Sequence, residues 1–166
     1  MNLQKNRILW ADDEIDHLKP HIMFLESKGY QVTSVTNAED ALASLQEDAF
    51  DLVLLDEMMP GMDGFEVCRR LKANPATHHI PVVMVTALDQ PADRIRGLEA
   101  GADDFLTKPV NDLALITRVK SLVRLKQMTD ELRSRAATSR DMGIEDPFAE
   151  AARASGENAR RLSETR

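Results

Sequence analysis

The sequence of 166 residues contains one cysteine and no long apolar run, and each shortage excludes a class of protein. The single thiol, Cys68, cannot form a disulfide within the chain, which favours a reducing compartment. No segment approaches the ~20 apolar residues that a membrane-spanning helix needs, and residues 1–7 do not resemble a signal peptide. We therefore expect a cytoplasmic protein with no membrane partner.

Positive charge is also scarce. The chain has 21 Lys and Arg residues against 28 Asp and Glu residues, and its net charge is -7 at pH 7. Proteins that bind nucleic acid usually present a basic face to the phosphates. Because the chain has this acidic excess and no basic recognition helix follows residue 125, we expect no nucleic-acid partner.

Apolar runs of strand length alternate with longer segments of helical spacing, which is typical of a parallel sheet covered by helices. Strands are predicted at 8–11, 31–35, 52–55, 82–85 and 103–106. Helices are predicted from Ile15 to the closing Gly29, after an Asn37 cap, after an Asp63 cap, over 90–100 and after Asn111. The fold class is therefore α/β, with a doubly wound five-stranded sheet and five helices.

The fifth helix is predicted to be unusually long, because its apolar residues keep helical spacing as far as Ala136. Residues 127–140 therefore form either a short coiled coil or the end of an amphipathic helix that packs on its own domain. Gly143 and Pro147 interrupt the remainder, which has few apolar residues. We expect a globular domain at 1–126, a helical extension at 127–140 and a linker or flexible tail at 141–166.

Chemically specific residues follow four of the predicted strands. Asp12 and Asp13 follow the first strand, Asp56 the third and Thr86 the fourth, while Lys108 lies just beyond the fifth. Carboxyl ends of parallel strands meet at one edge of an open α/β sheet, where such sheets bind their ligands. We therefore expect a pocket of carboxylates with one hydroxyl and one ammonium group, which suits a divalent metal ion and a phosphoryl group.

Hard divalent cations such as Mg²⁺ prefer oxygen ligands and retain several waters. Asp13 and Asp56 are the candidate direct ligands, and Asp12 is expected to hold a metal-bound water. The carbonyl group of Met58 can complete the site, since the turn at Pro60 bends the chain back. A cation there would stabilise the ionised form of Asp56 and keep it nucleophilic.

Attack of the Asp56 carboxylate on phosphorus would give an acyl phosphate. Lys108 can neutralise one phosphoryl oxygen, and the Thr86 hydroxyl group can donate a hydrogen bond to another.

Two other functions use related features. A phosphatase of the haloacid dehalogenase type usually carries a second Asp where this chain has Met58, and a flavin phosphate would be repelled by the carboxylates at 12–14. We therefore favour the phosphoacceptor.

Four segments, at 8–14, 54–64, 85–87 and 101–109, together resemble the receiver domain of two-component response regulators, over about residues 7–125. The resemblance implies a flavodoxin-like sheet in the order 2-1-3-4-5. It implies Mg²⁺-dependent phosphorylation of Asp56 by a histidine kinase, a phosphotransfer protein or a small phosphodonor. Such a domain is not an enzyme in the usual sense but assists its own phosphorylation and dephosphorylation.

The resemblance also assigns roles to residues around the pocket. Thr86 and Phe105 would act as the switch, the hydroxyl group moving toward the phosphoryl group while the ring turns inward. Phe105 stands where a tyrosine is often found, so no ring hydroxyl contact can form. Met58 and Leu88 would flank the pocket mouth and control access of water. The signal would pass to a partner chain, or across a homodimer, through the face made by helix 4, strand 5 and helix 5.

Different parts of the chain resemble different receivers. Residues 80–143 resemble the first receiver of PleD-type diguanylate cyclases, whereas residues 8–35 resemble receivers of PorX-type regulators. This pattern suggests an engineered or recombined receiver, and limited mosaicism in a natural sequence is the alternative. No Gly-Gly-Asp-Glu-Phe segment is present, so cyclase chemistry is not expected within these residues.

Overall fold

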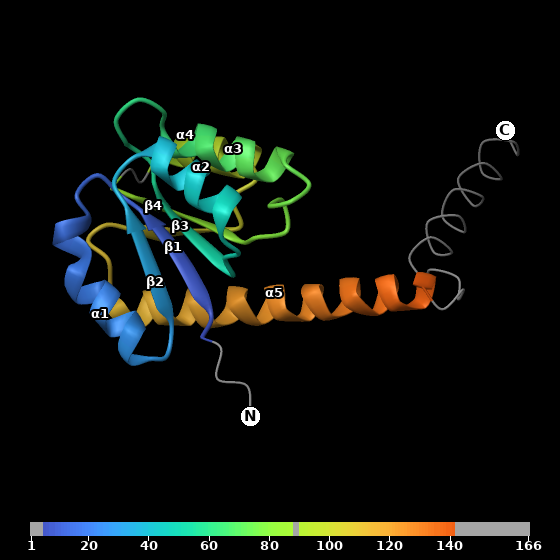
Figure 1. The fold of residues 1–166 in the computed structure, drawn as a ribbon. Coiled ribbons are helices and arrows are strands. Elements are labelled where there is room, and N and C mark those ends of the chain that lie inside the picture. Colours follow the sequence, from blue (N-terminus) through green and yellow to red (C-terminus); the bar gives the residue numbers. More distant parts are fainter. Residues whose placement is uncertain (1–4, 88–89, 142–166) are drawn as a thin grey trace, which may run out of the picture. The chain divides into compact units, whose positions relative to one another are not determined.

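The computed structural model describes residues 5–87 and 90–141, which form a five-stranded parallel sheet in the order β2-β1-β3-β4-β5. The predicted fold class and strand order are confirmed (Figure 1). In chain order the elements are β1 (Arg7–Ala11), a 3₁₀ helix (Ile15–Leu18), α1 (Lys19–Ser27), β2 (Gln31–Val35), α2 (Ala38–Glu47), β3 (Leu52–Asp56), α3 (Gly64–Ala73), β4 (Val82–Thr86), α4 (Pro91–Glu99), β5 (Asp104–Thr107) and α5 (Asp112–Asp141).

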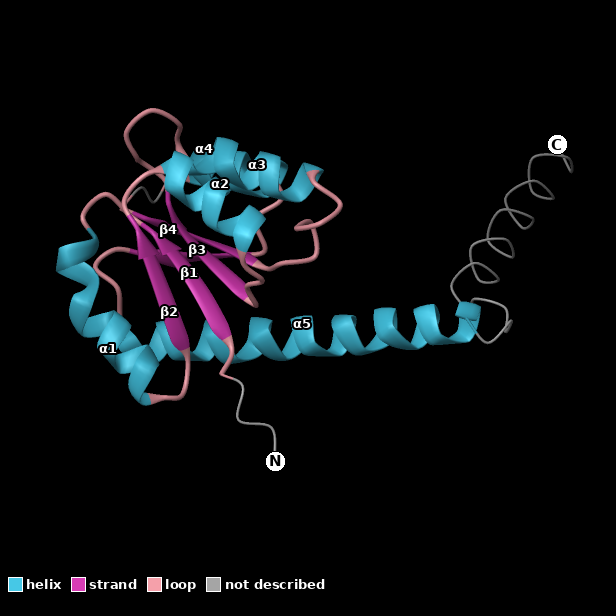
Figure 2. Ribbon diagram, in the orientation of Figure 1, coloured by secondary structure: helices cyan, strands magenta, loops and turns pink. Residues whose placement is uncertain are grey.

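Helices cover both faces of the sheet, with α2, α3 and α4 on one face and α1 and the part of α5 up to Lys126 on the other (Figure 2). Because successive strand residues point to opposite faces, each central strand contributes to both cores. All residues of β3 and β4 are buried. The core toward α2, α3 and α4 receives Leu9, Ala11, Val53, Leu55, Val82 and Met84. The core toward α1 and α5 receives Ile8, Trp10, Leu52, Leu54, Val83 and Val85.

The predicted helix caps are present. Asn37 Oδ1 accepts a hydrogen bond from the Asp40 amide at 2.8 Å, and Asp63 Oδ1 accepts one from the Glu66 amide at 2.9 Å. A side-chain oxygen at this position satisfies an amide that has no partner within the helix. The caps fix where α2 and α3 begin, and α3 therefore starts eight residues after the strand end at Asp56.

Two predicted boundaries differ from the structure. The helical spacing that begins at Ile15 is divided, because a 3₁₀ turn comes first and α1 starts only at Lys19. Proline lacks an amide hydrogen and is accommodated in a first helical turn, and Pro20 occupies that position here. Strand β5 lies one residue later than predicted, since the carboxylate of Asp103 accepts a hydrogen bond from the Val82 amide at 2.8 Å.

Cys68 lies on the core-facing side of α3 and is fully buried. Its thiol donates a hydrogen bond to the backbone oxygen of Ala100 at 3.4 Å. Burial raises the pKa of the Cys68 thiol to about 11. The sulfur therefore stays protonated near neutral pH and behaves as a packed apolar group.

Helix α5 runs without a break from Asp112 to Asp141, and the chain divides into two compact units after Lys126. Within the first unit, the buried Lys126 Nζ lies 3.4 Å from Asp51 Oδ1. The coiled coil proposed for residues 127–140 stays a prediction, and residues 142–166 of the proposed tail lie outside the described residues. None of the helices within the described ranges is long and apolar enough to cross a membrane.

Candidate functional site

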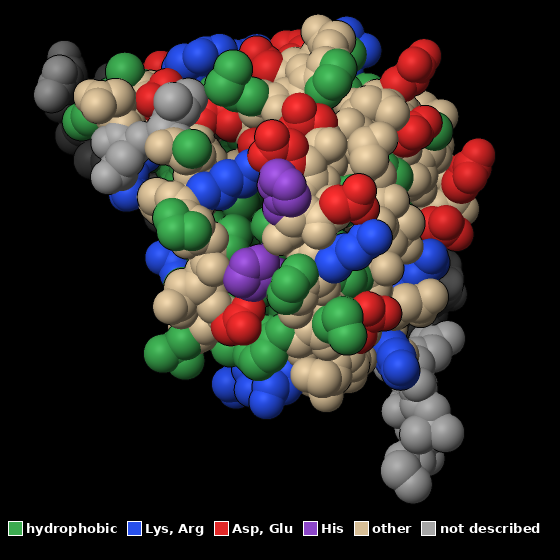
Figure 3. Space-filling view, turned by 90° about the vertical axis from the view of Figure 1, so that its left-hand side faces the viewer, with side chains coloured by type: hydrophobic (Ala, Val, Ile, Leu, Met, Phe, Trp, Pro, Cys, Tyr) green, Lys and Arg blue, Asp and Glu red, His purple; other side chains and the backbone are tan. Residues whose placement is uncertain are grey.

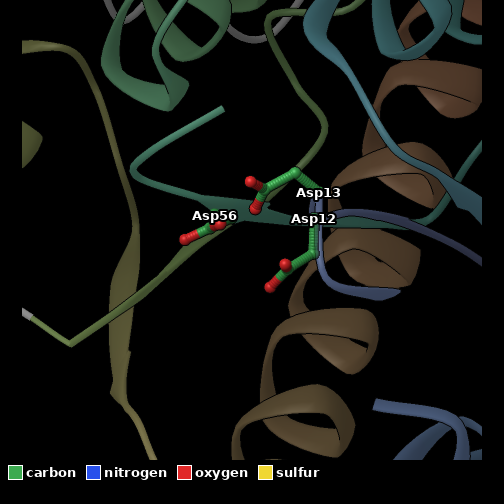
Figure 4. A group of neighbouring side chains, drawn as sticks. All are labelled: Asp12, Asp13 and Asp56. Carbon is green, nitrogen blue, oxygen red and sulfur yellow. The ribbon is translucent and has the colours of Figure 1, made fainter. Parts of the chain in front are cut away.

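Three carboxylates lie together at the carboxyl ends of two neighbouring strands. Asp12 and Asp13 follow β1, and Asp56 ends β3, which pairs with β1 so that Ala11 is opposite Leu55. One oxygen from each carboxylate lies within 4.8 Å of the others. Asp12 and Asp56 are buried, whereas Asp13 is exposed. Figure 4 shows the three side chains directed into the same space.

Lys108 supplies a positive charge to this cluster. Its Nζ lies 3.0 Å from Asp12 Oδ2 and 3.2 Å from Asp56 Oδ1. Burial lowers the pKa of Lys108, but the two carboxylates outweigh that effect, and the pKa is raised from its ordinary value. The backbone amide of Lys108 donates to the Thr86 carbonyl oxygen at 2.8 Å, so pairing with β4 holds this residue at the strand ends. The ammonium group therefore stays charged and points at the carboxylates.

Asp56 is strongly affected by its surroundings. Burial and the neighbouring charge of Asp12 raise the pKa of Asp56 to about 6, while Lys108 acts in the opposite direction. A desolvated carboxylate beside another negative charge favours its protonated form. Lys108 alone therefore does not neutralise the negative charge of the three carboxylates. The remaining negative charge favours binding of a divalent cation.

This raised pKa predicts how stability depends on pH in metal-free solution. Between the unfolded-state value of 3.8 and the folded-state value of about 6, the folded protein binds more protons than the unfolded chain. The free energy of unfolding should therefore fall as pH rises through this window, by about 3 kcal/mol from Asp56. Urea denaturation in EDTA at several pH values measures the slope. The slope should be smaller in Asp56→Asn, and equal slopes would contradict the assignment.

The backbone of Asp56 is approached closely by Gly64, the first residue of α3. A Cβ atom built on Gly64 would lie 2.1 Å from the Asp56 carbonyl oxygen. The Gly64 amide also donates to the Glu57 carbonyl oxygen at 2.9 Å. Only a residue without a side chain allows the loop after β3 to close this tightly.

We expect Gly64→Ala to lower the free energy of unfolding by about 3 kcal/mol, because the β3–α3 loop must move to relieve the overlap. Gly29→Ala is the matched control. Gly29 has a φ of +97° but no atom within 4 Å of an added Cβ, so its cost should be the ~1 kcal/mol of a left-handed alanine. Equal losses of stability in the two variants, measured by urea denaturation, would show that the overlap is relieved without cost.

Thr86 and Phe105, the predicted switch residues, lie on the α3 and α4 side of this site. Thr86 ends β4 and is buried, and its hydroxyl group donates a hydrogen bond to Glu57 Oε2. The Phe105 ring is packed against α4, because a Cβ atom on Gly97 would lie 2.5 Å from Phe105 Cε1. Glu57 and these two residues line a common cavity of about 10 Å³.

Glu57 is a buried residue beside the site that was not predicted from the sequence. It lies two residues past the predicted third strand, directly after Asp56, in a position where an acidic residue is ordinarily exposed. In the structure it is 3% exposed. Burial raises the pKa of Glu57, and the hydrogen bond from Thr86 acts in the opposite direction. The signal in the sequence is its place two residues after the apolar run 52–55, which does not by itself indicate burial.

The mouth of the site opens on a hollow of about 430 Å³, lined by Asp13, Glu57, Met58, Met59, Pro60, Asp63, Phe65 and Arg96. The side chain of Met58 lines this hollow and is 68% exposed, and its role in controlling access of water stays a prediction. Leu88 lies outside the described residues. Figure 3 views the side of the molecule on which the strands end, and acidic side chains gather there beside histidine, lysine and arginine side chains.

The strand order, with an acidic cluster and a lysine at the strand ends, defines a class, the flavodoxin-like doubly wound proteins. A family model described as "Response regulator receiver domain" matches residues 8–120. The chain therefore belongs to the receiver domains of two-component response regulators, whose role is phosphoacceptor signalling. The resemblance found in the sequence is confirmed, and the phosphatase and flavin alternatives are not favoured.

Two curated relatives illustrate the similarity. The chain is 51% identical over 142 residues to Response regulator PleD of Caulobacter vibrioides, covering 83% of this chain and 30% of that protein. It is 38% identical over 134 residues to the transcriptional regulatory protein ResD of Bacillus subtilis, covering 81% of this chain and 55% of that protein. The chain thus spans between about a third and a half of the length of these relatives.

Solved receiver structures have the same fold. A CheY-like receiver domain protein from Methanospirillum hungatei aligns with a TM-score of 0.71 and 28% identity, covering 76% of this chain and 99% of that one. A signal receiver domain of a histidine kinase from Syntrophus aciditrophicus aligns with a TM-score of 0.67 and 40% identity, covering 72% of this chain and 90% of that one. These alignments support the flavodoxin-like assignment. The hypothesis that the chain is a chimera stays a prediction.

Proposed function

We propose that Asp56 is the residue that accepts the phosphoryl group, and that Asp12, Asp13, Lys108 and Thr86 serve this transfer. The observation that carries the proposal is the buried carboxylate pair of Asp12 and Asp56 joined by one lysine. A structural ion pair would need only one carboxylate per ammonium group. The surplus of negative charge around Asp56 instead suits a site that gains a cation and then a phosphoryl group.

In the transfer, an Asp56 carboxylate oxygen forms a bond to phosphorus as the bond between phosphorus and its donor breaks. If the donor is the phosphohistidine of a histidine kinase or phosphotransfer protein, the imidazole nitrogen leaves with the electron pair. A small phosphodonor such as acetyl phosphate would release acetate in the same way. Lys108 would pair with one phosphoryl oxygen and Thr86 would donate to another, neutralising charge that the loose transition state spreads over the oxygens.

The donor set fits Mg²⁺, because the three carboxylates supply the hard oxygen ligands that this ion prefers. Asp13 and Asp56 would bind it directly, Asp12 would do so through a water, and the carbonyl oxygen of Met58 would complete the protein ligands. When bound, Mg²⁺ would supply positive charge beside Asp56 and favour its ionised form. The chain would in this sense assist its own phosphorylation and the later hydrolysis.

Intact-mass spectrometry after incubation with acetyl phosphate tests the proposal. With Mg²⁺ present we expect one added phosphoryl group per chain, and with EDTA we expect none. p-Nitrophenyl phosphate should not be turned over, since no second acid follows Asp56 at the position that a dehalogenase-type phosphatase uses. Steady release of nitrophenol, or the absence of any added mass with Mg²⁺, would reject the phosphoacceptor assignment.

The remaining sequence predictions describe how the signal leaves the domain. We propose that residues 1–126 form the receiver, that Thr86 and Phe105 report phosphorylation, and that Met58 and Leu88 control access of water. The output would reach a partner chain through α4, β5 and α5, or through a homodimer formed by that face or by the extended α5. The cytoplasmic location and the lack of a nucleic-acid partner stay predictions.

A further inference from the structure

The residue that follows the proposed phosphoacceptor is a buried glutamate, and it holds the hydroxyl group of Thr86. The Thr86 hydroxyl donates a hydrogen bond to Glu57 Oε2, and both side chains are more than nine-tenths buried. The bond therefore forms in a place with little competing water, where hydrogen bonds to charged groups are strongest.

Strand pairing brings the two residues together. In the ladder between β3 and β4, Asp56 is opposite Val85, and the Glu57 amide donates to the Val85 carbonyl oxygen at 3.4 Å. Extending this register by one residue places Glu57 beside Thr86. Alternation puts Thr86 on the same face as Val82 and Met84, which is the face of α3 and α4. The Thr86 hydroxyl group therefore lies on the face of the sheet that α3 and α4 cover, where Glu57 can accept its hydrogen bond.

The other oxygen of this carboxylate has no evident structural use. Glu57 Oε1 is buried and accepts no hydrogen bond from any residue that the structure describes. A buried carboxylate with an unsatisfied oxygen costs stability, and an apolar side chain of similar size would not. Packing alone therefore does not account for a buried glutamate at position 57. Its hydrogen bond with Thr86 is the interaction that accounts for it.

A threonine hydroxyl group carries one proton and can donate one hydrogen bond at a time. We propose that Glu57 is a positioning residue that holds Thr86 in the unphosphorylated arrangement by competing with the phosphoryl group for this proton. Phosphorylation of Asp56 must break the bond to Glu57 before Thr86 can donate to a phosphoryl oxygen. Glu57 thereby sets how readily the active state forms. The inference rests on the proposed function of Asp56.

The test measures the affinity for beryllofluoride, which stands in for the phosphoryl group, by ¹⁹F NMR titration at fixed Mg²⁺. Glu57→Met removes the acceptor and keeps the volume, whereas Glu57→Gln keeps a neutral acceptor and removes the charge. Thr86→Val removes the hydroxyl group and keeps the shape. Glu66→Gln is the matched control, since Glu66 lies on the surface of α3 and pairs with Arg69 and Arg70.

We expect Glu57→Met to bind beryllofluoride about tenfold more tightly than the parent, which is the size of one lost hydrogen bond to a charged group. Glu57→Gln should bind roughly threefold more tightly, because a neutral acceptor holds the hydroxyl group less strongly. Glu66→Gln should equal the parent. Glu57→Met should also unfold at a higher urea concentration, which a structural glutamate would not do.

The double variant Thr86→Val with Glu57→Met decides the mechanism. Competition for the hydroxyl proton predicts that the gain from Glu57→Met disappears once Thr86 lacks that proton. A gain that persists in the Thr86→Val background would show that Glu57 acts only through its charge and would overturn the inference, as would parent-like binding by Glu57→Met. If Glu57→Met does not fold, the same cycle is run with Glu57→Gln. A parent that binds no beryllofluoride would reject the proposed function itself.

Discussion

Asp56→Asn should abolish phosphoryl uptake from acetyl phosphate, with no added mass under conditions in which the parent is fully phosphorylated. An amide lacks the charged oxygen that attacks phosphorus, and Lys108 cannot replace it, because its raised pKa keeps it an ammonium group with no free electron pair. Intact-mass spectrometry over a time course with Mg²⁺ measures the effect, which we expect to exceed roughly a thousandfold in initial rate.

The Asn variant should nevertheless be well folded. Replacing a buried carboxylate whose pKa is raised to about 6 by a neutral side chain of the same shape removes repulsion from Asp12. Its urea midpoint at pH 7 in EDTA should therefore lie above that of the parent. The control is Asp63→Asn, which keeps a capping oxygen on α3 and should be phosphorylated normally. Phosphorylation of the Asp56→Asn chain at another site would contradict the assignment.

Lys108→Met should slow phosphorylation by about a hundredfold, the usual cost of losing one group that stabilises developing negative charge. The Nζ atom lies within 3.2 Å of Asp56 Oδ1, close to where phosphoryl oxygens would arrive. Methionine keeps most of the length of the side chain and removes its charge. Phosphorylation at saturating Mg²⁺ isolates the chemical step, and a rate within about threefold of the parent would remove Lys108 from the mechanism.

A second lysine provides the comparison. Lys72 also contacts a carboxylate, with its Nζ 2.9 Å from Asp103 Oδ2, but it anchors the loop before β4 far from Asp56 in the fold. Lys72→Met should lower the free energy of unfolding and leave the phosphorylation rate of the folded protein unchanged. A similar loss of rate in both variants would indicate a general effect of removing positive charge.

The core of the site could be predicted because its geometry follows from strand order. Asp12 and Asp56 end apolar runs, and two parallel neighbouring strands place their final residues side by side. Lys108 could be predicted for the same reason. These inferences need the direction of the strands, which the alternation of strands and helices along the chain indicates. They also need the order of the strands, which the resemblance to receiver domains implied.

Glu57 could not be predicted in this way, because its burial depends on which residue of β4 lies beside it. The register of one strand pair is a tertiary property, and an acidic residue just past a strand is ordinarily solvated. The division of the first helical segment into a 3₁₀ turn and α1 could not be predicted either. Spacing alone does not distinguish a 3₁₀ turn from the α-helix that follows it, and only the backbone requirement of Pro20 separates them.

The buried thiol of Cys68 has a practical consequence for work on this protein. Maleimide and iodoacetamide reagents attack thiolates, and a sulfur that stays protonated in the core offers them almost none at neutral pH. A cysteine introduced at an exposed position such as Leu98 would then be the one reactive thiol of the folded molecule. Fluorophores or spin labels could be attached there without rebuilding the interior, and they would report directly whether α4 moves when the chain is phosphorylated.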